Sequence, residues 1–145
     1  NILSEDFGIQ ADVWSCPSFN ELKRDGDDCV RWNLMHPDQK PRIPHVTACL
    51  EKHSGPVVAA TDYVKLFADQ IRAYVGRNYH VLGTDGFGRS DTRASLRRHF
   101  EVNRYYVTVA ALKTLADEGT IPAKTVKSAI RKYKLDPEKP NPLNV

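Results

Sequence analysis

Residues 79–93 read YHVLGTDGFGRSDTR, a mostly apolar run that leads into a loop with three glycines. The run over residues 79–82 predicts a short β-strand, since four to eight such residues bounded by turn signals are typical of a strand. The glycines end that strand, and a helix is expected from about residue 90 to residue 100. This order of strand, loop and helix favours an α/β fold.

The segment before this stretch predicts a second strand and a connecting helix. Residues 56–61 contain the continuous apolar run VVAA, as expected for a strand that is covered on both faces. Asp62 is expected to cap a helix that runs to about Val75 and is closed by Gly76. The aromatic and aliphatic side chains of this helix recur at helical spacing, at Tyr63, Phe67, Ile71 and Tyr74.

The rest of the chain also alternates between the two kinds of element. Strands are predicted over residues 11–16 and 45–50, and helices over residues 19–35, 103–118 and 122–134. Strands that alternate with helices imply an α/β layer fold with a mostly parallel sheet.

Two further expectations concern the ends of the chain. Residues 1–7 are interpreted as the last turns of a helix that Gly8 terminates, so that a segment of the protein is expected to precede them. Residues 1–135 are predicted to form one domain, and residues 136–145, with three prolines, an exposed tail.

The predicted helix over residues 19–35 has Ser18 or Asn20 as a candidate cap, and Gly26 with the acidic residues beside it counts against an unbroken helix. Its buried side is expected to carry Phe19, Leu22, Val30 and Leu34.

Composition is that of one soluble domain, with 145 residues, 41% of them hydrophobic and 27% charged. No apolar run approaches the ~20 residues that span a bilayer, so no membrane partner is expected. The three cysteines, Cys16, Cys29 and Cys49, lack a CxxC spacing. This disfavours a disulfide framework or a cysteine zinc site, and a cytoplasmic location fits best. The five histidines show no HExxH pattern, which disfavours a metal site.

The net charge of +3 lies entirely in residues 101–145. Within residues 119–134 there are five cations and no acid: Lys124, Lys127, Arg131, Lys132 and Lys134. This basic stripe has two interpretations. It is either the solvated face of an amphipathic helix, or a surface through which a basic α/β module binds nucleic acid or an acidic protein.

The glycine-rich loop, residues 83–91, is the densest candidate for a functional feature. Glycines between a strand and a helix resemble an anion-binding turn. The order is G-x-x-G-x-G rather than G-x-G-x-x-G, no P-loop lysine follows, and Asp85 and Asp91 would repel a phosphate. The alternative is a strained connection that positions a helix or a subunit contact.

Several stretches, in order along nearly the whole chain, carry a family resemblance. The most specific is VLGTDGFGRSDTR over residues 81–93, which continues as LRRHFEV over residues 96–102. Residues 11–15, 28–36 and 61–68 agree as well. Together these stretches closely resemble the C-terminal domain of the homodimeric bacterial pyruvate dehydrogenases, a branch of the transketolase-like enzymes.

The resemblance implies a three-layer α/β fold, with a mixed, mostly parallel sheet, helices on both faces, and a first strand that precedes Asn1 and is missing here. It implies that thiamine diphosphate and Mg lie in two upstream domains of the intact enzyme, which decarboxylates pyruvate and acetylates a lipoyl group. A thiamine diphosphate signature needs GDG with paired asparagines downstream, but Thr84 precedes Asp85-Gly86 and no Asn-Asn follows. No catalytic, cofactor-binding or metal-binding residue is therefore expected here, and the chain alone is expected to be inactive.

The partners that the resemblance implies are the rest of the same polypeptide, the second subunit of a homodimer and the dihydrolipoyl acetyltransferase core. Nucleic acid is not among them. The loop with Phe87 and Arg89 has residue types that are enriched at contacts. The interface candidates are Gly83, Asp85, Gly86, Phe87, Gly88, Arg89, Ser90, Asp91 and Arg93.

Overall fold

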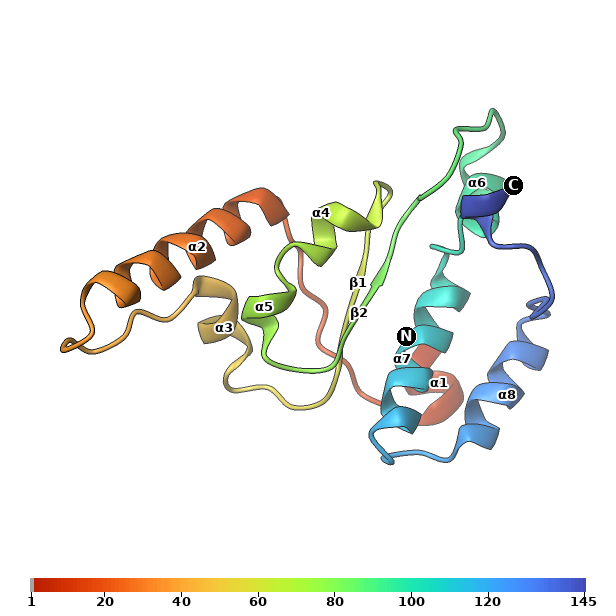
Figure 1. Ribbon diagram of the computed structural model, residues 1–145. Helices are drawn as coiled ribbons and strands as arrows, with labels where there is room; N and C mark the ends of the chain where they lie inside the picture. Colours follow the sequence, from red (N-terminus) through yellow and green to blue (C-terminus); the bar gives the residue numbers. More distant parts are fainter. Residues whose placement is uncertain (1) are drawn as a thin grey trace.

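A two-stranded parallel sheet lies between two groups of helices in the computed structural model, which describes residues 2–145 (Figure 1). Strand β1 (Val57–Ala60) pairs with β2 (Tyr79–Leu82), with Val57 opposite Tyr79 and Ala60 opposite Leu82. Helices α2 to α5 lie on one side of the sheet, and α1, α7 and α8 on the other. The expected α/β fold with helices on both faces of a parallel sheet is confirmed.

Local sequence signals explain most helix boundaries. The Ser18 hydroxyl accepts a hydrogen bond from the Glu21 amide and caps the helix that begins at Phe19. The Asn103 side chain caps the helix that begins at Arg104 in the same way. Gly76 adopts a left-handed φ of 67° and ends the helix that precedes it. The helices are α1 (Ile2–Phe7), α2 (Phe19–Met35), α3 (His45–Leu50), α4 (Lys65–Asp69), α5 (Arg72–Val75), α6 (Arg93–His99), α7 (Arg104–Asp117), α8 (Ala123–Lys132) and the 3-10 turn η1 (Pro142–Asn144).

The first of two cores joins the sheet to α4 and α5. Its buried members are Ala68, Ile71, Val75, Tyr79 and Val81. Tyr79 and Val81 alternate along β2 and therefore point to the same face of the sheet. The Tyr79 hydroxyl donates a 2.7 Å hydrogen bond to the Ala68 carbonyl, and burial raises its pKa to about 12.

Helix α2 covers this core with one stripe of its surface. Phe19 and Leu22 pack on the core, and Gly26 is buried so close to Tyr74 that a Cβ atom would lie 2.3 Å from the ring. The expectation that Val30 and Leu34 are buried is wrong, since they are 55% and 76% exposed. The far half of α2 projects beyond the sheet (Figure 1).

Two predicted strands are not strands. Residues 45–50 form α3, because Pro44 starts a helix whose Val46 and Leu50, four residues apart, both pack on the first core. Residues 11–16 form no sheet hydrogen bonds within the described part of the chain. This segment is held instead by Asp12, which accepts a 2.8 Å hydrogen bond from His53 Nδ1.

Two predicted helices start later than expected. Helix α4 begins at Lys65, so Asp62 does not cap it, and the helix breaks near Gln70 before α5 continues. Helix α6 begins at Arg93 and not at Ser90, with the Thr92 hydroxyl as its cap. In both places several irregular residues follow the strand before the helix begins.

The second core lies between α7, α8 and α1. Leu112 is fully buried there with Val126 and Ala129, and Leu3 and Phe7 of α1 pack against them. The Tyr133 hydroxyl donates a 2.6 Å hydrogen bond to Asp6, and Lys132 pairs with the same carboxylate at 2.6 Å. Helix α8 is amphipathic, with Val126 and Ala129 buried and the basic stripe exposed, as both interpretations of the stripe require.

The last ten residues turn back onto the domain instead of being exposed throughout. The η1 turn buries Pro142 beside α6, next to the glycine-rich loop (Figure 1). No helix within residues 2–145 is both long and apolar enough to cross a membrane.

Candidate functional site

The glycine-rich loop leaves the carboxyl end of β2 and runs to α6, beside η1 (Figure 1). Its exposed part contains Gly86, Phe87, Gly88, Arg89, Ser90 and Asp91. Phe87 is the most prominent of them, because 81% of this large apolar residue is exposed. These six sequence candidates are therefore all accessible to solvent.

Two of the loop glycines have packing reasons. A Cβ atom on the buried Gly83 would lie 2.7 Å from both the Lys65 amide nitrogen and the Tyr63 carbonyl oxygen. Gly86 has a φ of 116°, and its Cβ atom would lie 2.4 Å from the Pro142 carbonyl oxygen. Gly88 differs, because a Cβ atom there would meet nothing within 4 Å. Gly83 and Gly86 thus fit the loop against neighbouring backbone, whereas Gly88 does not.

Asp85 fixes the base of the loop. Its carboxylate accepts a 2.8 Å hydrogen bond from the Lys65 amide and so caps α4 from a distant segment. The Thr84 amide donates a 2.8 Å hydrogen bond to the Tyr63 carbonyl nearby. Both contacts hold the start of the loop on the chain that follows β1.

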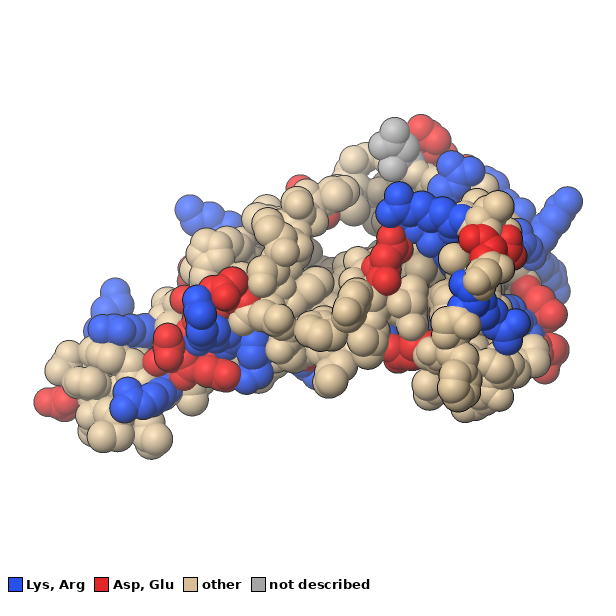
Figure 2. All heavy atoms as spheres, turned by 90° about the horizontal axis from the view of Figure 1, so that it is seen from above, with Lys and Arg blue, Asp and Glu red and all other residues tan. Residues whose placement is uncertain are grey.

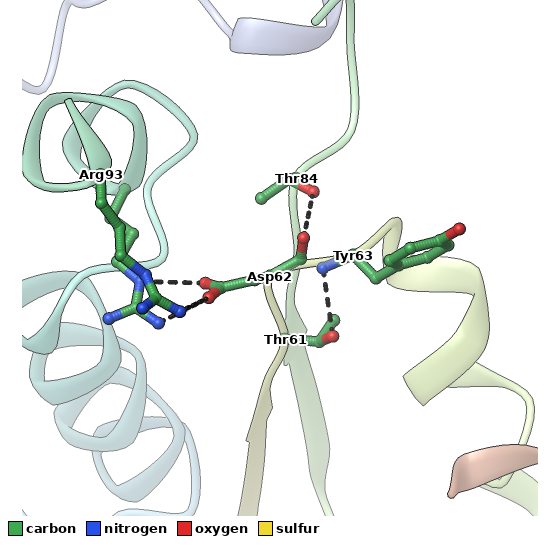
Figure 3. Close-up of polar contacts among 6 residues, drawn as sticks. Thr61, Asp62, Tyr63, Thr84 and Arg93 are labelled. Atoms are coloured by element: carbon green, nitrogen blue, oxygen red, sulfur yellow. Dashed lines mark hydrogen bonds and ion pairs between the residues drawn. The ribbon is translucent and has the colours of Figure 1, made fainter. Parts of the chain in front are cut away.

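An ion-pair cluster ties the chain after β1 to α6. Arg97 donates to both carboxylate oxygens of Asp62, at 3.0 and 2.6 Å, and Arg93 donates to one of them at 3.2 Å. The carboxylate of Asp62 points toward α6, while its backbone carbonyl accepts a 3.2 Å hydrogen bond from the Thr84 hydroxyl (Figure 3). Hydrogen bonding from Arg97 holds the pKa of Asp62 below its ordinary value of 3.8.

This cluster assigns a different role to one sequence candidate and adds residues that sequence reasoning missed. Arg93, expected at an interface, is already engaged by Asp62. Asp62 and Arg97 were not among the candidates, because 35 residues separate them and no local motif joins them. Asp91 accepts a 2.6 Å hydrogen bond from the Thr92 amide and lies two residues before the start of α6.

A hollow lies between the loop and α6. Its volume is about 380 Å³, and it is lined by Arg89, Ser90, Asp91, Ser95, Leu96 and His99. Lys and Arg side chains lie on both halves of the molecule in Figure 2, with Asp and Glu among them. The hollow thus lies between the exposed end of the loop and α6, a helix rich in cations.

The described residues do not fit a magnesium–diphosphate site. No three His, Cys, Asp or Glu side chains within residues 2–145 come together in an arrangement that could hold a metal ion. Of the loop acids, Asp85 is engaged with Lys65 and Asp91 with Thr92.

Comparison with known proteins places the chain in a family. A family model described as the transketolase-like TK C-terminal domain matches residues 1–103. The chain belongs to the transketolase-like C-terminal domain family. The resemblance carried by residues 81–93 is thereby confirmed.

Named relatives extend the similarity over the whole chain. The pyruvate dehydrogenase E1 component of Cupriavidus necator is 59% identical over 145 residues, which is 100% of this chain and 16% of that protein. The E1 component of Pseudomonas aeruginosa is 59% identical over 144 residues, 99% of this chain and 16% of that protein. The E1 component of Escherichia coli K12 is 54% identical over 142 residues, 97% of this chain and 16% of that protein. The chain thus spans about one sixth of the length of these curated relatives.

Proposed function

We propose that this transketolase-like domain is the C-terminal part of a pyruvate dehydrogenase E1 component and supports subunit and domain assembly rather than catalysis. The intact enzyme would decarboxylate pyruvate and acetylate a lipoyl group of its acetyltransferase partner. Thiamine diphosphate and Mg²⁺ would bind on its other domains, and the enzyme would act in the cytoplasm. The identity of 54 to 59% to E1 components supports the assignment of the parent enzyme.

The observation that carries the assembly role is the way Phe87 is presented. The loop is anchored at its base by Asp85, which caps α4, and at its middle by Gly86, which lies against Pro142. Between these anchors and α6, Phe87 is 81% exposed. A large apolar side chain held in this way contributes contact area to a partner at a small cost in conformational entropy.

The partner that fits is another domain or the second subunit of the same enzyme. Arg89 follows Phe87 by two residues and is exposed, and aromatic residues and arginine are enriched at the centres of protein interfaces. The candidates Gly83, Asp85 and Gly86 shape the loop from inside, whereas Phe87, Gly88, Arg89, Ser90 and Asp91 form its outer surface.

Substitution of the loop tests this role in the full-length enzyme. Phe87→Ala and Arg89→Ala are each expected to weaken the dimer about tenfold or more, measured by analytical ultracentrifugation, and activity is expected to fall at low enzyme concentration. Lys127→Ala, which removes an exposed cation of α8, is the control and is expected to change neither quantity. An unchanged dimer constant and activity in both loop variants would contradict the proposal.

A further inference from the structure

Helix α8 has a charged surface that the assembly role does not use. The helix lies at the edge of the molecule, with α7 and α1 on its inner side, and buries Val126 and Ala129 in the second core (Figure 1). Three exposed cations, Lys124, Lys127 and Arg131, follow one another at spacings of three and four residues. Residues at these spacings share one face of a helix, and here that face is opposite the buried side. We call it the cationic face.

The positive charge of the cationic face is not neutralised from within the described chain. None of the ion pairs formed among residues 2–145 includes Lys124, Lys127 or Arg131. The neighbouring Lys132 differs, because it pairs with Asp6 of α1 at 2.6 Å. Helix α8 itself contains no acidic residue. Three positive charges therefore face solvent together.

Other helices of the same chain place acids one turn away from their exposed cations. On α7, Lys113 pairs with Asp117 four residues later, and α2 has an ion pair of the same spacing. On α8, the residue four positions after Lys127 is Arg131, another cation. Like charges at this spacing weaken a helix. The cationic face thus carries an electrostatic cost that the acids of α2 and α7 avoid.

The position of Lys124 adds a second cost. Lys124 is the second residue of α8 and lies in the first turn, where the helix dipole favours acids and disfavours cations. No acidic residue in that turn compensates for it. Packing of α8 on the second core does not require a cation at this exposed position. A contact with an acidic group outside the chain gives Lys124 a role.

Nucleic acid and membrane surfaces fit the cationic face less well than a protein does. Phe7 packs against the second core and Tyr133 stacks on Tyr105, with ring centroids 4.8 Å apart, so these rings are not available to stack on bases. An amphipathic helix binds a membrane surface through its apolar face, but α8 buries Val126 and Ala129 inside the domain. Charge complementarity with an acidic protein remains as the basis for recognition.

We propose that the cationic face of α8 docks an acidic helix of a partner protein. At the 1.5 Å rise per residue of a helix, its cations are about 4.5 Å and about 6 Å apart along the axis. Carboxylates one turn apart on a second helix repeat at the same distances, whereas side chains on one face of a strand are about 7 Å apart. A helix alongside α8 can therefore place one carboxylate against each cation. The face shares no residue with the glycine-rich loop, so the docking is independent of the proposed assembly role.

Titration of two synthetic helical peptides into the 145-residue chain at low ionic strength tests the docking. The first peptide carries glutamates one turn apart along one face, and the second has the same composition with its glutamates spread around the helix. The first is expected to bind about tenfold more tightly, to shift the NMR signals of α8 amides, and to lose affinity as salt is raised. Equal affinities, or shifts confined to other elements, would overturn the proposal.

A triple variant of α8 tests the three cations themselves. Because single exposed ion pairs contribute little, Lys124→Gln, Lys127→Gln and Arg131→Gln are combined, and the first peptide is expected to bind about tenfold more weakly. The melting temperature of this variant is expected to be no lower than that of the unaltered chain, since repulsion between like charges is removed. Loss of binding therefore reports on the cationic face and not on unfolding.

A matched control separates the cationic face from general attraction. It also removes two lysines and one arginine from exposed positions, but elsewhere in the chain: Arg31→Gln, Lys40→Gln and Lys52→Gln. Its net charge equals that of the first variant, and its affinity for the first peptide is expected to stay within about twofold of the unaltered chain. Equal losses in the two variants, or absence of peptide binding, would overturn the proposal. A short RNA and a DNA duplex are titrated as well, and tighter binding of either one than of the first peptide would assign the face to nucleic acid instead.

Discussion

Arg97 donates two hydrogen bonds to the carboxylate of Asp62, although 35 residues separate them in sequence. Asp62 lies two residues after the end of β1, and Arg97 lies in the middle of α6. This contact holds α6 against the carboxyl end of the sheet, so the loop between β2 and α6 is fixed at both ends.

Removal of the Asp62 charge is expected to loosen α6. Asp62→Asn leaves Arg93 and Arg97 without a carboxylate, and we expect a loss of about 1 kcal/mol in unfolding free energy, since the pair is bidentate but partly exposed. Urea unfolding measures this. Asp117→Asn, which breaks the exposed pair with Lys113 on α7, is the control and is expected to cost less than about 0.5 kcal/mol. Equal losses would contradict the role given to Asp62.

The pH dependence of stability follows from the same carboxylate. The pKa of Asp62 is below its ordinary value of 3.8 in the folded chain, so the unfolded chain binds a proton first as pH falls. The stabilising contribution is complete above pH 3.8 and is lost as pH falls through the folded pKa. The melting temperatures of the unaltered chain and of Asp62→Asn are therefore expected to converge as pH is lowered from 5. A constant difference between them would contradict this assignment.

The two exposed loop glycines are expected to respond differently to alanine. Gly86→Ala places a Cβ atom 2.4 Å from the Pro142 carbonyl at a φ of 116°, and we expect it to cost about 2 kcal/mol and to displace η1. Gly88→Ala meets open space and is expected to change the unfolding free energy by less than about 0.5 kcal/mol. Thermal unfolding of the two variants makes the comparison, and the reverse order would show that the loop packs differently.

Gly26 is expected to tolerate no side chain on α2. Gly26→Ala drives a methyl group into the Tyr74 ring, 2.3 Å from its Cε2 atom, and we expect it to cost about 2 kcal/mol. Adding Tyr74→Leu makes room for that methyl group. The double variant is therefore expected to lose less than the sum of the two single losses, as urea unfolding of all four proteins would show. Additive losses would contradict a direct contact.

Local sequence patterns predicted the elements whose signals are short in range. The VVAA run gave β1, the Ser18 hydroxyl marked the start of α2, and Gly76 marked the end of α5. Residues 45–50 were predicted as a short strand, yet they form a helix, because Val46 and Leu50 then both pack on the first core. At this segment, packing on the core rather than the local sequence pattern decides the secondary structure.

The candidate loop was predictable, but its supports were not. Three glycines and Phe87 identified the loop from the sequence alone. The partners of Asp62 and Asp85 come from segments 20 or more residues away, which no periodicity links to them. The hollow beside His99 depends on the position of α6, so it became visible only with the fold.

The hydrogen bond from Tyr133 to Asp6 closes a loop of 127 residues, the longest separation among the side-chain contacts described for residues 2–145. Contacts this distant form late in folding, because the intervening chain must be ordered first. Helix α1 has no fully buried residue of its own. Its amides should therefore exchange with deuterium before those of β1 and β2, and its departure would bare the apolar side of α8 while the sheet stays intact.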